Sequence, residues 1–294
     1  MRLHRIKSGI RALIAVAVMF IMAQGSATAQ SGTGLWTGAG LKKDLPKGMN
    51  AEFEAEWRQT GFFTETDRWS AGASVSKRLY RNKDKTFNVR ADLGYRYMLS
   101  NRQEYTTDKR DPELFEQEDG MPAQYYLDNH IDFNLTNDFL ESRHRFSASV
   151  SAGYEVSRFK FSLRERGQYT YSCGKADIRD KHRFSEKTDM ITGNPYYEDS
   201  ITVVNVKPSS KVILRSRISV DYDIPHFKLD PFVSYEVFSD LSGREAFEKG
   251  RLTAGTGFTL KKKHAFQLAY IWQNRIDDDE SVKSAVSINY TFKF

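Results

Sequence analysis

Apolar and polar residues alternate strictly along this sequence, and this period of two restricts the fold more than any other feature. In residues 49–59, Met49, Phe53 and Trp57 fall on one set of positions, and Glu52 and Glu54 fall on the other. Because successive side chains of a β-strand point to opposite faces, such a stretch forms a strand with one apolar and one polar face. The chain is therefore predicted to be all-β.

Eleven such stretches follow one another, at 35–43, 49–59, 68–79, 86–99, 145–156, 159–171, 211–224, 229–238, 251–260, 265–274 and 282–294. A mean hydropathy of −0.60 is compatible with a membrane barrel, because the polar residues that face the lumen dilute the average. A secreted β-sandwich also alternates, but its strands are shorter. We therefore expect an antiparallel transmembrane up-and-down β-barrel of about 10–12 strands.

The odd count is difficult to reconcile with this fold, because bacterial barrels nearly always have an even number of strands. Either 35–43 is an extension of the chain, which leaves ten strands, or one further strand is hidden. Residues 125–139 are the best candidate for a hidden strand, since Leu127, Ile131, Phe133, Leu135 and Phe139 recur on one face. Inserting a strand there would reverse the sidedness of every earlier turn, so the alternative is that this stretch is an external extension of a neighbouring hairpin.

The first 29 residues have the features of a cleaved secretory signal. Basic residues precede an apolar run at 12–22, and Ala27-Thr28-Ala29 has the small-x-small pattern of a cleavage site. We expect one barrel domain over 30–294. The signal carries four of the basic residues behind the formal charge of +6, and no basic cluster follows it, so nucleic acid is not expected as a partner.

The last strand ends on alternating aromatic residues, Tyr290, Phe292 and Phe294. This ending resembles the signal that outer-membrane barrels present to their insertion machinery, which is therefore expected as a partner together with outer-membrane lipid. Short turns alternate with longer connections along the chain, and barrels of this class place the long ones outside the cell. The two longest connections, near 100–142 and 173–210, are predicted to be external loops.

The polar face of the strands supplies a predicted lumen. Its candidate charge network consists of Glu52, Glu54, Glu56, Arg58, Arg90, Asp92, Arg96, Arg164, Arg166, Arg215, Arg217 and Glu236. Arginine forks pair with carboxylates in bidentate fashion, so one interpretation is a cross-linked network that makes the interior rigid. The other is a charge-lined conduit or ligand pocket, with Glu52, Glu54 and Glu56 facing Arg164, Arg166, Arg215 and Arg217.

Catalytic chemistry has weaker support in the sequence. A barrel phospholipase would need a His-x-Ser-Asn run on a strand, and the histidines are scattered instead. The acidic run at 277–280 lacks the ligand spacing of a dedicated calcium loop. No catalytic residue, metal ligand or cofactor is therefore assigned.

Several short motifs resemble one known family. They are an opening strand with Trp36, Glu54 to Arg58, Gly94-Tyr95-Arg96, Arg143 to Phe146, and Pro231 to Glu236. The chain is similar to a family of Gram-negative outer-membrane proteins known only as a domain of unknown function. The resemblance implies an outer-membrane barrel and supplies no catalytic residues.

Three functions follow as hypotheses. The first is a non-enzymatic barrel that is a narrow porin-like pore, binds a small solute or has a structural role. The second is a membrane-embedded enzyme that acts on outer-membrane lipid. The third is a surface protein that binds an extracellular partner through the loops at 100–142 and 173–210.

Overall fold

The computed structural model of the chain describes residues 33–225, 229–243, 247–275 and 281–294. The predicted signal at 1–29 and the acidic run at 277–280 lie outside the described residues. The chain divides into two compact units, and each is described by itself. The barrel unit consists of Met1–Tyr97, Arg145–Thr170 and Lys211–Phe294. The accessory unit consists of Met98–His144 and Tyr171–Ser210.

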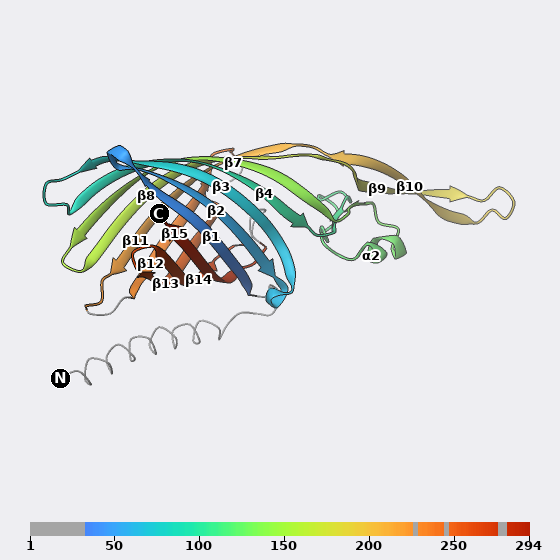
Figure 1. Ribbon diagram of the computed structural model, residues 1–294. Helices are drawn as coiled ribbons and strands as arrows, with labels where there is room; N and C mark the ends of the chain where they lie inside the picture. The colour runs from blue at the N-terminus through green and yellow to red at the C-terminus, as the bar shows by residue number, and fades with distance from the viewer. Residues whose placement is uncertain (1–32, 226–228, 244–246, 276–280) are drawn as a thin grey trace, which may run out of the picture. The chain divides into compact units, whose positions relative to one another are not determined.

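Eleven strands close into a barrel in the order β1-β15-β14-β13-β12-β11-β8-β7-β4-β3-β2 (Figure 1). The fold class predicted from the period of two is thus confirmed. The strands are β1 (Gly34–Leu45), β2 (Met49–Thr60), β3 (Glu65–Arg81), β4 (Phe87–Arg102), β7 (Phe139–Val156), β8 (Phe159–Ser172), β11 (Ser209–Tyr222), β12 (Asp230–Asp240), β13 (Lys249–Leu260), β14 (His264–Gln273) and β15 (Ser284–Lys293).

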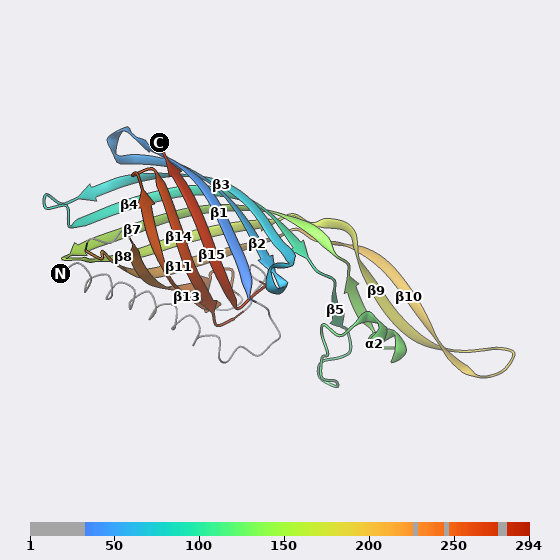
Figure 2. The same ribbon diagram turned by 60° about the horizontal axis from the view of Figure 1, so that its bottom comes forward.

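The barrel closes through a parallel pair of strands. β1 runs parallel to β15, with Gly34 beside Ala285 and Leu41 beside Phe292 (Figure 2). The other pairs with a described register are antiparallel, such as β1 with β2 and β14 with β15. The expectation that an odd count requires a strand to be removed or added was wrong. In an up-and-down barrel with an odd number of strands, the first and last strands point the same way, and a parallel ladder joins them.

Tight turns join the strands at the end of the barrel where β1 and β15 finish. Pro46–Gly48 forms a short 3-10 turn between β1 and β2, with Lys47 at φ 59° and Gly48 at φ 72°. Ser157, at φ 55°, lies in the two-residue turn between β7 and β8. We call this end of the barrel the turn end, and the opposite end the loop end.

The outer face of the barrel is apolar and exposed. Leu93 has 68% of its surface exposed, and Leu79, Trp69 and Phe146 are each more than half exposed. Aromatic rings pair toward both ends of the wall: Trp57 stacks on Trp69 toward the loop end, whereas Phe258 stacks on Phe266 near the turn end. The described chain contains no helix that is both long and apolar enough to span a membrane.

The accessory unit contains a four-stranded sheet in the order β10-β9-β6-β5. Its elements are β5 (Tyr105–Asp108), α2 (Ala123–Asp128), β6 (Phe133–Thr136), β9 (Lys175–Thr188) and β10 (Pro195–Val206). Tyr126 of α2 and Phe133 of β6 are fully buried, and their rings stack with centroids 4.8 Å apart. The segments predicted as loops thus contain regular structure, and the stretch proposed as a hidden strand, 125–139, divides between α2, β6 and the start of β7.

Candidate functional site

The barrel encloses a cavity of about 330 Å³, which we call the lumen cavity. Every one of the eleven barrel strands supplies at least one of its lining residues. The cavity therefore lies inside the barrel. Its charged lining consists of eight arginines and four glutamates: Arg58, Arg96, Arg145, Arg164, Arg166, Arg215, Arg217, Arg251, Glu52, Glu54, Glu56 and Glu236.

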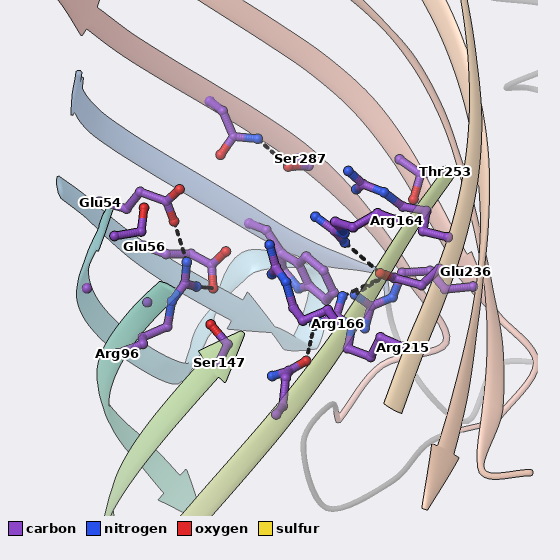
Figure 3. A pocket seen from close by; sticks show the side chains of 18 of the residues that line it. Glu54, Glu56, Arg96, Ser147, Arg164, Arg166, Arg215, Glu236, Thr253 and Ser287 are labelled. Atoms are coloured by element: carbon purple, nitrogen blue, oxygen red, sulfur yellow. Dashed lines mark hydrogen bonds and ion pairs between the residues drawn. The ribbon is translucent and has the colours of Figure 1, made fainter. Parts of the chain in front are cut away.

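One wall of the lumen cavity is acidic because β2 alternates. Glu52, Glu54 and Glu56 occupy every second position of β2 and therefore share one face. Arg96 of β4 forms ion pairs with both Glu54 and Glu56, and Arg58 donates a hydrogen bond from Nε to Glu56 Oε1 at 2.7 Å (Figure 3). Two arginines thus hold neighbouring carboxylates that would otherwise repel one another.

A second cluster forms where β8, β11 and β12 meet. Glu236 is only 3% exposed, and its two carboxylate oxygens accept hydrogen bonds from Arg164 at 2.7 Å and from Arg215 at 2.6 Å (Figure 3). Arg251 Nη1 lies 4.0 Å from the same carboxylate. One buried carboxylate therefore neutralises part of a wall that is mainly basic, which we call the arginine wall: Arg164, Arg166, Arg215 and Arg217.

Aromatic side chains support arginines near the loop end of the lumen. The Arg58 guanidinium lies 3.7 Å from the centre of the Trp36 ring, and Arg251 lies 5.4 Å from it. Trp36 is 5% exposed. A guanidinium that stacks on an indole face gains cation–π attraction and loses rotational freedom, so these arginines are held in defined positions.

Ten of the twelve predicted network residues line the lumen cavity. The remaining two, Arg90 and Asp92, line a second cavity of about 560 Å³. The acidic β2 residues and the arginine wall line the same cavity. However, the ion pairs of Glu54 and Glu56 go to Arg96 and Arg58 and not to the arginine wall.

The aromatic residues of the predicted insertion signal lie at the turn end. The rings of Tyr290 and Phe266 pack at a tilt with their centroids 5.0 Å apart, and the rings of Phe292 and Phe294 stack with their centroids 6.1 Å apart. The backbone N–H of Phe294 donates to the carbonyl of Lys42 on β1. These contacts describe a packed strand end, and a role in insertion stays a prediction.

The prediction missed some lining residues. Trp36 was assigned to the opening strand without a place in the lumen, and Gln168 was not considered, although it accepts a hydrogen bond from Arg215 Nη1 at 2.8 Å. The alternation of each strand could have identified both residues, because side chains an even number of positions apart point to the same face. Trp36 lies six positions before Lys42, and Gln168 lies four and two positions after Arg164 and Arg166, so each belongs to the polar face of its strand.

The four histidines in the described part of the chain do not line the lumen cavity. His182 pairs with Asp199 through Nδ1 at 2.7 Å in the accessory unit, and His264 pairs with the Tyr290 hydroxyl at 2.9 Å. Across residues 33–225, 229–243, 247–275 and 281–294, no group of three or more His, Cys, Asp or Glu side chains is arranged to hold a metal ion.

The accessory unit has its own charged cluster around the buried Asp108. Burial alone raises the pKa of this carboxyl, but hydrogen bonds from the Arg110 side chain and from the backbone N–H groups of Arg110 and Glu118 outweigh it and lower the pKa to about 2. Arg110 also pairs with Glu118 at 3.0 Å. The cluster therefore ties 108–118 together as an ionised network.

Comparisons with known proteins place the chain among others of unknown activity. A family described as "Protein of unknown function (DUF2490)" matches residues 33–282. No curated protein matches the sequence. Among solved structures, the chain is similar to the crystal structure of the beta domain of the Bordetella autotransporter BrkA, with 10% sequence identity, a TM-score of 0.39, and coverage of 84% of this chain and 82% of that chain.

Proposed function

The chain belongs to the DUF2490 family of proteins of unknown function, and from that premise we propose that it is an outer-membrane β-barrel whose lumen admits a small charged solute. Family membership supplies no activity. The observation that carries the proposal is the lumen cavity, which all eleven strands line and to which seven of them supply charged side chains.

The outer wall supports a membrane location. Soluble monomers rarely expose contiguous apolar patches of more than a few hundred Å², yet Leu79, Leu93 and Phe146 are more than half exposed on the barrel strands. The strands run from 10 residues in β14 to 18 in β7, long enough to cross a bilayer at a tilt. An apolar outside with a polar inside is the arrangement that outer-membrane barrels require.

The size of the lumen cavity limits what can enter it. About 330 Å³ lies at the lower end of the range for ligand pockets, which admits a small solute. Barrels of 16 to 18 strands leave a wide aqueous channel, whereas this barrel has eleven strands and long arginines that reach inward. The proposed solute is therefore small and contacts charged walls.

Fluorescent labelling tests the membrane location with two cysteines on the same strand, in a cysteine-free background. Val150 is exposed on β7, and Ser147 of the same strand lines the lumen cavity. An environment-sensitive dye at V150C is expected to emit in the blue and to be quenched by spin-labelled lipid, whereas the dye at S147C is not. Equal quenching at the two positions would contradict the membrane assignment.

Planar-bilayer recording tests solute entry. Refolded protein whose heat-modifiable migration on gels shows a folded barrel is expected to give discrete current steps smaller than those of 16- to 18-stranded porins. If such protein gives no steps, and small charged solutes also fail to protect S147C from a thiol reagent, the proposal is wrong. Lipid turnover by the same preparation would instead support the enzyme hypothesis.

A further inference from the structure

The arginine wall places like charges opposite one another on neighbouring strands. A hydrogen bond of 2.6 Å joins the hydroxyl groups of Ser162 and Ser219, and the Ser216 hydroxyl donates to the Glu165 carboxylate at 2.6 Å. Both contacts indicate the same antiparallel register between β8 and β11. In this register Arg164 lies opposite Arg217, and Arg166 lies opposite Arg215. Like charges directly opposite on a sheet destabilise it unless a counter-charge is present.

Glu236 provides only part of that counter-charge. It stands opposite Arg217 in the register of β11 with β12, but its carboxylate oxygens contact Arg164 and Arg215. Within the part of the barrel that the structure describes, Arg166 and Arg217 make no ion pair. The Nε atoms of Arg164 and Arg166 are also buried without a hydrogen-bond partner. Buried polar groups nearly always have a partner, so these donors indicate a missing acceptor.

Three residues of the arginine wall lie between two cavities. Arg164, Arg166 and Arg217 line the lumen cavity and also the second cavity, whose other residues flank the tight turns. The second cavity is strongly basic: it has eight lysines and arginines, with Asp92 and Glu155 as its acidic residues. A solute that passes from one cavity to the other therefore meets Arg166 and Arg217, and the surrounding positive potential favours an anion.

We infer that Arg166 and Arg217 form a binding site for a small oxyanion, carrying phosphate or carboxylate groups, within the barrel. Two guanidinium forks can donate parallel hydrogen bonds to such a group, which would also neutralise the opposed arginines. This inference rests on the proposed function, since it names the class of solute that the lumen admits.

Inorganic phosphate is the probe for the first test, with protein refolded in a phosphate-free detergent so that no lipid headgroup competes. Binding is measured by the line width of the phosphorus resonance. Replacing one guanidinium by an amide, as in R166Q or R217Q, is expected to weaken phosphate binding by about 10- to 150-fold, because it removes a charge-assisted hydrogen bond. The exposed turn residue Lys83 provides a charge-matched control, K83Q, that should bind as wild type does.

Stability provides a second readout that requires no channel. Phosphate is expected to raise the urea midpoint of the wild type and of K83Q, but not of the double variant R166Q/R217Q. Without phosphate, the double variant should be at least as stable as wild type, because it lacks the opposed charges. R166K keeps the charge and is expected to bind phosphate more weakly than wild type but better than R166Q.

Recordings separate this inference from the proposed function. Under a KCl gradient, wild type is expected to prefer chloride, and R166Q/R217Q to lose that preference. Current steps without anion preference, together with no phosphate binding by the folded protein, would overturn the oxyanion site and leave the solute-admitting barrel in place. Phosphate binding without current steps would support the site and contradict conduction.

Discussion

The ion pairs of Glu236 are expected to contribute far more to stability than the ion pair between Glu52 and Lys42. Glu236 is 3% exposed and accepts hydrogen bonds from Arg164 at 2.7 Å and Arg215 at 2.6 Å. In E236Q one acceptor oxygen remains, but two guanidinium groups on side chains that are only 14% exposed lose their counter-charge. A hydrogen bond to a charged group contributes about 1.5–3 kcal/mol, so E236Q should lower the free energy of unfolding by about 2–4 kcal/mol.

Glu52 provides the matched control for this prediction. It pairs with Lys42 at 3.3 Å, and about a quarter of each side chain is exposed. Water reaches this partly exposed single pair and screens it, so its contribution should be near the ~0–1 kcal/mol of surface pairs, about 1 kcal/mol at most, and E52Q should have a small effect. Removing Arg215 as well, in E236Q/R215Q, should recover part of the loss, because one of the unbalanced charges is removed with its partner.

Urea titration of refolded protein in lipid vesicles, followed by tryptophan fluorescence, measures these free energies. A folded band on unheated gels confirms that each variant forms a barrel before it is compared. If E236Q and E52Q lose stability equally, within about 0.5 kcal/mol, water in the lumen already screens the Glu236 pairs. Burial and hydrogen-bond geometry would then not determine how much a lumen ion pair contributes to stability.

Three further predictions concern the packing of the barrel strands, the pairing of β1 with β15, and the accessory unit. A Cβ added at Gly255 would lie 2.7 Å from carbon atoms of β14, so G255A should destabilise the barrel by about 1–3 kcal/mol in the same urea titration. A Cβ added at Gly167 would have no atom within 4 Å, so G167A is the control and should leave the stability nearly unchanged. In a cysteine-free background, T37C and I288C should form a disulfide under mild oxidation, because these residues are partners in the parallel β1–β15 ladder; failure to cross-link in folded protein would contradict that closure. The pKa of Asp108 falls from 3.8 to about 2 on folding, so ionised Asp108 stabilises the accessory unit fully above about pH 4, and this stabilisation is lost as the pH falls through about 2. Amide exchange in 105–136, corrected for intrinsic rates, should therefore become faster as the pH falls from about 4 to about 2. The D108N variant should not show this pH dependence.

The sequence by itself determined the fold class and the two faces of the wall. Alternation is a local property, since each strand residue points to the side opposite its neighbour. Reading 49–59 was therefore sufficient to assign Glu52, Glu54 and Glu56 to the polar face, and the same parity extends to Trp36 and Gln168. No knowledge of which strands pair was needed for these assignments.

Tertiary structure decided everything that depends on which strands are neighbours. The eleven stretches were countable in the sequence, but only the β1–β15 register shows that an odd barrel closes through a parallel pair. One partner of Glu56 is local, since Arg58 lies two residues further along β2, but its ion pair with Arg96 of β4 depends on strand order and could not be read from the sequence. The same order leaves Arg166 and Arg217 beside other arginines, because a period of two specifies the face of a residue and not the charge that it meets.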